Sequence, residues 1–434
     1  SDYVHSLKTQ ESFKKKMSVS IRAKKALTVS CPMFDCFSEA KDKLNEPGFI
    51  NLGVAHNDLL QNMISDKLKK CVEIKEEDFN YGLPMGSVKL RVLVADFLNR
   101  HFVPYYPLKE HHIFVETGAG ASIYQLVMNI SDIGDYCMIP VPYYGAFDLD
   151  VGVHTGVRIL EAHVHDPYTM RVDEEELKII YQEAINAGKK MTSILITNPS
   201  NPSGRCYSRK DLDVFLKFAS THQLHVIFDE IYALSSYSHF VDASKPDPFV
   251  SILSIDYETV IDPSLVHVIY GMSKDFAMNG FRIGFIIDQF NEPLKTSLMC
   301  SAHFSYISSL TDRMLCNFFS DETWVDKYIV ANRKELAVTY EKTTGFLRKN
   351  GIEFIPGEAG HFFMINTRSF LNKKDVTLDD EKRIWRNMIN RGVYVVPGYA
   401  FHTHMSGYFR LTFALPWDIL KLGLERMVKG LKDE

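Results

Sequence analysis

Residues 266–287 read VHVIYGMSKDFAMNGFRIGFII, two apolar runs joined by a short polar segment. The runs VHVIYG and RIGFII are rich in β-branched and aromatic residues, which predicts two strands. Too few residues lie between them for a helical crossover, so we expect the second strand to run antiparallel to the first. Lys274 and Arg282 lie in the connecting segment and are therefore expected at one edge of the sheet.

Upstream of this stretch, five further apolar runs alternate with segments of helical periodicity. The runs are HIFVET, YCMIPV, VRILEAHV, TSILIT and LHVIF. This alternation is typical of an α/β fold with a mostly parallel sheet of about seven strands, covered by helices on both faces. After residue 300 the pattern changes to a long helical region, three short strands (HFFMIN, VYVVPG, YFRLTFAL) and a closing helix. We therefore expect an N-terminal arm with part of a small domain over residues 1–56, a large domain over 57–300 and the rest of the small domain over 301–434.

Composition limits the classes of partner. The chain has 434 residues, 46% hydrophobic and 24% charged, with a net charge of −5, so it can bury a large core and has no general attraction for nucleic acid or anionic membranes. Its seven cysteines are scattered, which predicts reduced thiols and no metal site. No apolar run is long enough to cross a membrane, so we expect a cytoplasmic protein with small-molecule or protein partners. The first 30 residues are basic; we interpret them as a solvated or dimer-wrapping arm, with a nucleic-acid or membrane arm as the alternative.

Polar side chains follow the predicted strands at the points where those strands end. Asn201 follows SILIT in the segment NPSNPSG, Asp229 and Tyr232 follow HVIF, and Ser273 and Lys274 follow VHVIYG. Each alone has an ordinary explanation as a turn former, a helix cap or a solvated charge. Ligands of open α/β sheets bind beyond the carboxyl ends of the strands, so the five together predict a binding site.

The segment ETGAGASIYQL supplies a further element. It places Gly118, Gly120, Ala121 and Ser122 at the start of a predicted helix, where free N–H groups and the helix dipole favour a phosphate. A dinucleotide-binding loop is the competing interpretation. The segment lacks that loop's third glycine and the acidic residue that follows it.

Pyridoxal 5'-phosphate requires all of these groups at once. It needs an amine for a Schiff base, a carboxylate for its ring nitrogen, donors for its phenolic oxygen and a site for its phosphate. The sequence supplies them as Lys274, Asp229, Asn201 with Tyr232, and Gly120 to Ser122 with Ser273 and Arg282.

At these motifs the chain resembles the fold type I family of pyridoxal-phosphate enzymes, the aspartate aminotransferase superfamily. Within it, the chain is most similar to 1-aminocyclopropane-1-carboxylate (ACC) synthase and its animal homologues. The resemblance covers about residues 40–430 and rests on INLGVAHNDL, PVPYYGAFDLD, ITNPSNPSG, FDEIYA, SKDFAMNGFRIGF and GYFRLTFA.

The resemblance implies a role for each matching residue. Lys274 would hold the cofactor and then shuttle the substrate proton, and Asp229 would pair with the ring nitrogen. Asn201 and Tyr232 would hold the phenolic oxygen, Tyr144 rather than Tyr143 would stack on the ring, and Ser273 and Arg282 would bind the phosphate. Arg410 would bind the substrate carboxylate, with Asn201, Ala55 and His56 on the substrate side. Tyr81 would reach the phosphate of a neighbouring subunit, which implies a homodimer with shared sites.

Two positions depart from the family pattern. Gly271 stands where a serine commonly donates to the phosphate, and His56 stands where plant ACC synthases have glutamate. The second exchange alters both charge and proton transfer near neutral pH and argues against ACC synthesis. The leading hypothesis is a protein that acts on an α-amino acid by transamination or β/γ-elimination. The alternative is a catalytically inactive cofactor-binding homologue that acts through protein association.

Overall fold

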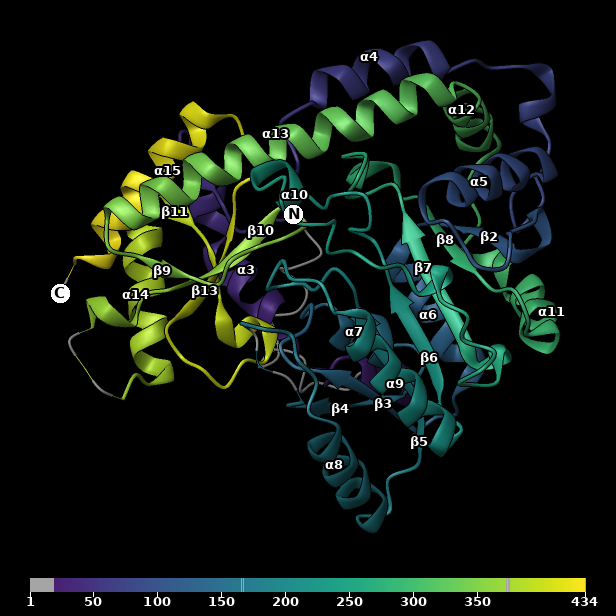
Figure 1. The fold of residues 1–434 in the computed structure, drawn as a ribbon, viewed down its shortest axis with the longest axis horizontal. Coiled ribbons are helices and arrows are strands. Elements are labelled where there is room, and N and C mark those ends of the chain that lie inside the picture. The colour runs from purple at the N-terminus through teal and green to yellow at the C-terminus, as the bar shows by residue number, and fades with distance from the viewer. Residues whose placement is uncertain (1–18, 165, 167, 372, 374, 434) are drawn as a thin grey trace.

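The computed structural model describes residues 19–433 except 165, 167, 372 and 374, and is centred on a seven-stranded sheet (Figure 1). The strand order is β2-β8-β7-β6-β5-β3-β4, and β8 is antiparallel to both of its neighbours. The prediction of seven strands with one antiparallel strand is confirmed. The strands are β2 (Ile113–Glu116), β3 (Tyr136–Pro140), β4 (Arg158–Ala162), β5 (Met191–Thr197), β6 (His225–Asp229), β7 (Val266–Gly271) and β8 (Gly284–Ile287).

Helices cover both faces of this sheet because successive strand residues point to opposite sides. On β6, Val226 and Phe228 pack with one core cluster, and Ile227 between them packs with the other. The first cluster includes residues of α4 (Gln61–Cys71), α5 (Val88–His101), α8 (Glu174–Asn186), α9 (Arg209–His222) and α12 (Ser309–Phe319). The second includes residues of α6 (Ala119–Ile130), α7 (Phe147–Gly152) and α11 (Glu292–Ser301).

A smaller α/β unit lies beside the large sheet, built on a four-stranded sheet of order β12-β13-β10-β9 and on the parallel pair β1-β11. The predicted strands HFFMIN and YFRLTFAL and the closing helix are present. The predicted strand VYVVPG is instead two strands of two residues, β11 and β12, in different sheets, and the two-residue strands β1 and β9 were not anticipated. The elements are α3 (Pro32–Leu44), β1 (Ile50–Asn51), β9 (Glu353–Phe354), β10 (Phe362–Asn366), α14 (Leu378–Asn390), β11 (Val393–Tyr394), β12 (Val396–Pro397), β13 (Tyr408–Thr412) and α15 (Trp417–Leu431).

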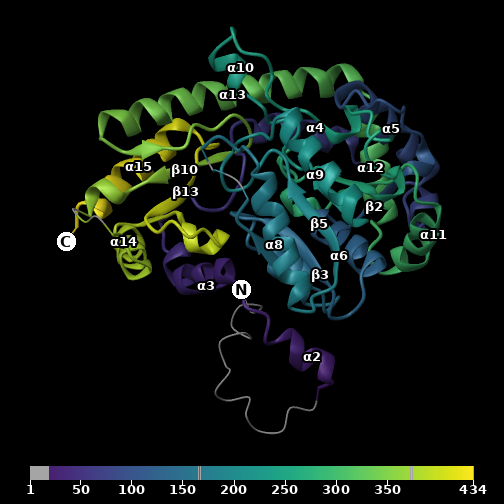
Figure 2. The same ribbon diagram turned by 60° about the horizontal axis from the view of Figure 1, so that its bottom comes forward.

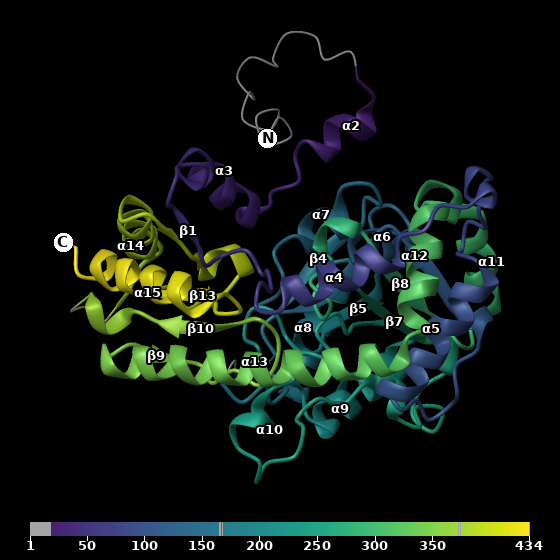
Figure 3. The same ribbon diagram turned by 90° about the horizontal axis from the view of Figure 1, so that it is seen from above.

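Helix α13 (Glu322–Lys349) runs along both units (Figure 3). Its Val325 and Tyr328 pack in the core of the large sheet, whereas Leu336 and Tyr340 pack in the core of the smaller unit. The first part of this helix therefore packs with the large sheet although it follows residue 300, and the domain boundaries drawn from the sequence stay a prediction.

At the N-terminal end, α2 (Ile21–Ala26) projects beyond α3 (Figure 2). Much of the predicted basic arm falls on residues 1–18, which lie outside the described residues. The short helix α10 (Ser238–Val241) lies against α13. None of the helices in the described part of the chain combines the length and apolar character needed to cross a membrane.

Candidate active site

A cavity of about 1310 Å³ lies at the carboxyl edge of the large sheet, where the smaller unit meets it. Twelve of the residues predicted from the sequence line it, and they come from segments spread over more than 350 positions of the chain. These residues are Ala55, His56, Gly120, Ala121, Tyr144, Asn201, Asp229, Tyr232, Ser273, Lys274, Arg282 and Arg410.

Lys274 lies just beyond the end of β7 and points into this cavity. Its Nζ donates to the carbonyl oxygen of Ala55 at 3.1 Å. Burial lowers the pKa of Lys274 to about 8; Arg410 and Arg282 add to the effect, and Asp229 opposes it. An amine with this pKa is a much better nucleophile near neutral pH than an ordinary lysine.

Asp229 ends strand β6, is 5% exposed and faces the same cavity. Burial raises its pKa to about 7, the backbone N–H of Ile231 opposes the rise, and Asp150 adds to it. Among the described residues no cation pairs directly with this carboxylate. A buried carboxylate of this kind suits a ligand that brings its own positively charged N–H.

Arg410 projects from β13 of the smaller sheet and is 3% exposed. Its Nη1 donates to Asn201 Oδ1 at 2.8 Å and its Nη2 donates to the carbonyl of Gly53. The guanidinium lies 4.7 Å from the ring centre of Phe362 and 4.8 Å from that of Phe401. Each Nη carries a second N–H besides the one in its hydrogen bond, and this planar donor set favours a planar carboxylate.

The start of α6 forms an anion cradle with Arg282. Gly118 has φ +102°, and a Cβ at this position would clash with the Arg282 guanidinium, so only glycine permits the close approach. Gly120, Ala121 and Ser273 line the cavity beside it. Ser122 is fully buried, and its hydroxyl donates to the Gly118 carbonyl at 3.3 Å, so its side chain lies outside the cavity.

The two tyrosines of PYYGAF have different surroundings. Tyr144 lines the cavity, as the sequence favoured. Tyr143 is buried behind it, donates to Asp148 at 2.8 Å and stacks on His402 with ring centres 4.5 Å apart. Only Tyr144 can therefore contact a ligand in the cavity.

Asp150 also lines the cavity, and the sequence analysis did not single it out. A Cβ on Gly120 would lie 3.1 Å from its Oδ1, so this carboxyl borders the anion cradle. Burial raises the pKa of Asp150 to about 7, and Arg282 opposes the rise. Asp150 is the last residue of FDLD, which is part of the motif PVPYYGAFDLD. An aspartate in a short helix is usually a helix cap or a solvent-exposed residue, so the motif alone did not mark it as a site residue.

His56 lies at the opposite side of the cavity, next to Ala55. Its side chain is open to solvent in the single chain, yet its neighbours crowd it enough that desolvation lowers its pKa. Lys274 adds to this effect and Asp58 opposes it. A neutral imidazole thus faces the cavity at pH 7.

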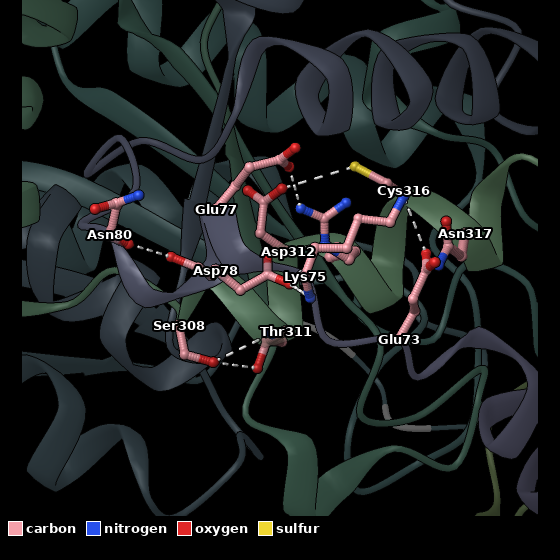
Figure 4. A network of polar contacts seen from close by, with 12 residues as sticks. Glu73, Lys75, Glu77, Asp78, Asn80, Ser308, Thr311, Asp312, Cys316 and Asn317 are labelled. Atoms are coloured by element: carbon pink, nitrogen blue, oxygen red, sulfur yellow. Dashed lines mark hydrogen bonds and ion pairs between the residues drawn. The ribbon is translucent and has the colours of Figure 1, made fainter.

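Tyr81 does not line the cavity; it is 96% exposed on a loop that follows the short turn Glu76–Phe79. The turn before this loop is fixed to α12, because Arg313 Nε donates to both carboxylate oxygens of Asp78, at 2.8 and 2.7 Å, and its Nη2 donates to Glu77 at 2.7 Å. The carbonyl of Asn80, next to Tyr81, also accepts from Ser309 Oγ at 2.9 Å, and Figure 4 shows Glu77, Asp78 and Asn80 beside this helix. The backbone is therefore held in place while the Tyr81 side chain points away from the molecule.

Comparison with known proteins agrees with this geometry. The family model "Aminotransferase class I and II" matches residues 47–425. A 1-aminocyclopropane-1-carboxylate synthase of Cucurbita maxima is 32% identical over 85% of the chain and 76% of its own length. A mouse protein named "probable inactive 1-aminocyclopropane-1-carboxylate synthase-like protein 2" is 30% identical over 91% of the chain and 67% of its length. In fold, the aspartate aminotransferase of Thermus thermophilus superposes with a TM-score of 0.76 at 18% identity, covering 96% of this chain and all of that one.

Proposed function

This chain belongs to the class I and II aminotransferase family, and we propose that it binds pyridoxal 5'-phosphate through Lys274 and acts on the amino group of an α-amino acid. The proposal depends mainly on two groups that face one cavity. One is the Lys274 amine, whose pKa is lowered to about 8, and the other is the buried Asp229 carboxylate, which has no cationic partner among the described residues. Either group alone occurs in ordinary cores. Both together match the two ends of one cofactor ring.

The residues present fit four parts of this cofactor. Asp229 offers a desolvated carboxylate for the ring nitrogen, and Tyr144 offers a ring face. Gly118 leaves the space that brings Arg282 against the helix start, where a phosphate would meet a guanidinium and free N–H groups. Asn201 and Tyr232 both line the cavity and can donate to the phenolic oxygen.

The chemistry divides between the cofactor and the chain. When bound, pyridoxal phosphate supplies a carbonyl that condenses with amines and a protonated ring that draws electrons from the substrate α-carbon. The chain's own part is to place Lys274 within reach of the substrate Cα, where its amine accepts and returns a proton. Arg410 holds the substrate carboxylate by its guanidinium edge, and Asn201 orients that guanidinium through the 2.8 Å bond.

We propose transamination or β/γ-elimination as the reaction, and we do not propose ACC synthesis. His56 places a neutral imidazole where the plant enzymes have a carboxylate, so a cationic sulfonium substrate would lack an anionic partner at that point. Ala55 and His56 then form the substrate wall next to Lys274. The substrate would be an amino acid with a neutral or anionic side chain.

A second candidate is a cofactor-binding homologue that works by association and not by turnover. Gly271, His56 and the name of the mouse relative favour it. Both candidates share a homodimer in which Tyr81 reaches the partner's phosphate site. The exposed side chain of Tyr81 and the fixed turn before it support this arrangement.

Absorbance of the purified chain with added pyridoxal phosphate tests the proposal. After unbound cofactor has been removed by dialysis, we expect a near-visible band that Lys274→Ala abolishes and that Lys295→Ala, which removes a buried lysine outside the cavity, leaves unchanged. A band retained by Lys274→Ala would refute the role of Lys274. Adding single amino acids and S-adenosylmethionine then separates the candidates, because an inactive homologue would shift the band without releasing product.

A further inference from the structure

His402 lies where the two units of the molecule meet, in the turn that follows the short helix Gly398–Phe401 of the smaller unit. Its Nε2 lies 3.0 Å from Asp148 Oδ2 on α7, and its Nδ1 lies 2.9 Å from Glu161 Oε1 on β4. Both carboxylates belong to the large unit, and β4 is the last strand at one side of its sheet. One side chain of the smaller unit therefore joins two elements of the large unit.

These two contacts determine the protonation state of His402. An ionised carboxylate has only acceptors, and a neutral imidazole has one N–H. Because each ring nitrogen faces a carboxylate oxygen, both are satisfied only when both carry a proton, so we assign an imidazolium. Burial opposes this charge, yet the hydrogen bonds to Asp148 and Glu161 raise the pKa of His402 to about 9. The hydrogen bond from His402 in turn lowers the pKa of Glu161.

Other titratable groups pack near this cation. Tyr143 stacks on His402, and burial raises the pKa of Tyr143. Burial also raises the pKa of Cys31, next to α3, to about 12, so both groups stay neutral up to about pH 10. His163, which follows β4, stacks on His404 with ring centres 3.6 Å apart, and burial lowers the pKa of His163. The loss of the His402 proton near pH 9 is therefore separate from the titrations of Tyr143, Cys31 and His163.

The turn that carries His402 packs tightly on the segment before α7. The backbone N–H of Tyr143 donates to the carbonyl of Phe401 at 3.2 Å. A Cβ at Gly145 would clash with the carbonyl of Ala400, so only glycine permits this approach of the two backbones. The ion pairs of His402 thus belong to a larger contact in which two loops are held backbone to backbone.

Residues next to this contact form part of the candidate active site. Phe401 precedes His402, and its ring centre lies 4.8 Å from the Arg410 guanidinium. Tyr144 follows Tyr143 and lines the cavity. His402 itself is not one of the described residues that line the cavity. It can therefore influence a ligand only through the neighbours that it holds in place.

We propose that His402 is a positioning residue: its imidazolium, held by Asp148 and Glu161, fixes the smaller unit against the large sheet and so holds Phe401 against Arg410. The inference rests on the proposed role of Arg410 in binding the substrate carboxylate. It deepens that role, because Arg410 is carried by the smaller unit and meets the rest of the site only while the two units are in contact. A neutral His402 offers one N–H to two carboxylates, which weakens this contact.

Calorimetric titration of the cofactor-loaded chain with propionate tests the inference. Propionate has the carboxylate of a substrate without its amine and is ionised above about pH 6, so its own charge is constant over the experiment. We expect His402→Asn to raise the dissociation constant of propionate about tenfold at pH 7, a size typical of groups coupled through one packed network. Asparagine tolerates the left-handed backbone of His402, which has φ +60°, so the variant removes the charge and keeps the turn.

The pH dependence distinguishes positioning from a general loss of packing. The advantage of the wild type over His402→Asn should shrink as the pH rises through about 9, because the wild type then loses the same charge. Charges elsewhere in the site act on both chains alike and cancel in the ratio. Glu161→Gln should weaken binding a few-fold and cause no further loss in the His402→Asn chain. His101→Asn is the matched control: it removes a histidine 3.0 Å from Asp326 Oδ1 on α13 and should leave the affinity unchanged.

The outcomes separate the inference from the proposed function. Equal affinities of wild type and His402→Asn at pH 7, or a ratio that stays constant with pH, would overturn the inference, with circular dichroism confirming the fold. Should His402→Asn fail to fold, Glu161→Gln decides by the same criteria. A wild type that binds no propionate, or whose binding survives Arg410→Ala, would overturn the role of Arg410 and this inference together. A missing cofactor band would refute the proposed function alone, because the titration can be made on the same chain without cofactor.

Discussion

Buried titratable groups lie at both edges of the large sheet. At one edge they hydrogen-bond to one another, and at the other they face a cavity. At the amino edge of the parallel strands, His225 on β6 and His267 on β7 bond to each other at 2.8 Å, and His267 bonds to Asp288 beyond β8 at 2.6 Å. At the carboxyl edge of the same β6 and β7, Asp229 and Lys274 face a cavity and make no hydrogen bond to each other among the described residues.

This difference distinguishes a structural cluster from a functional one. Buried polar groups that bond to one another stabilise the fold, whereas those left facing a cavity keep their desolvation cost until a ligand supplies the partner. The pKa values record that cost: burial raises that of Asp229 to about 7 and lowers that of Lys274 to about 8. Isosteric Asp→Asn substitutions at each edge should therefore have different consequences.

Asp229→Asn should have the largest effect, and on ligand binding. Replacing the carboxylate by an amide removes the charged partner proposed for the ring nitrogen in a buried site, which costs about 3 kcal/mol or more. The dissociation constant for pyridoxal phosphate should rise roughly 100-fold. Titration of the near-visible absorbance measures it, with Asp288→Asn as the matched control at the other edge.

The same variant should respond differently to pH when cofactor is removed. The folded chain holds a proton on Asp229 up to about pH 7, whereas the unfolded chain releases it near the ordinary value of 3.8. Stability from this proton is complete below the lower value and is lost as the pH rises through the higher one, by up to roughly 4 kcal/mol. Denaturant unfolding at pH 5 and pH 8 should thus show a smaller loss for Asp229→Asn than for the wild type. An equal loss in both chains would mean that Asp229 is not the unsatisfied group we take it to be.

The sheet could be predicted from the sequence because each of its strands is a separate apolar run with its own boundary signals. The short segment between β7 and β8 also predicted correctly that β8 is antiparallel. The two-residue strands β1 and β9 could not be predicted, because two residues show no periodicity. Each forms only by pairing with another strand, β1 with β11 and β9 with β10.

The candidate site was predictable wherever a polar residue follows a strand, as Asn201, Asp229 and Lys274 do. The place of His361 was not predictable, because it precedes β10 in the smaller unit and comes against Tyr232 only through the packing of one sheet against the other. Ser122 illustrates the converse: its place at a helix start predicted a phosphate donor, but its hydroxyl is bonded within the helix. Sequence position fixes the edge of the sheet on which a residue lies, and not the direction of its side chain.

Asp288→Asn should have a smaller effect, and on stability. The two oxygens of Asp288 accept from His267 Nδ1 and from the backbone N–H of Asn291, whereas asparagine has one oxygen for these two donors. One bond becomes neutral and one donor loses its acceptor, which costs about 1–3 kcal/mol. We expect a fall of that size in the free energy of unfolding, measured by urea denaturation, with cofactor absorbance unchanged. A variant that kept full stability would remove the contrast between the two edges.

Asp78→Asn sharpens the comparison, because this carboxylate is paired in a turn at the surface, where its own side chain is 8% exposed and that of Glu77 beside it is 77% exposed. The Arg313 guanidinium holds the pKa of Asp78 below its usual range, so the ion pair forms, yet solvent and salt screen it. We expect no measurable change in the thermal midpoint. In the proposed dimer we expect at most a few-fold rise in the dissociation constant by sedimentation, through a looser Tyr81 loop. Arg313→Gln, which releases Glu77 as well, should weaken the dimer more. If Asp78→Asn destabilised the chain as much as Asp288→Asn, pairing alone and not burial would decide the stability contributed by a carboxylate in this protein.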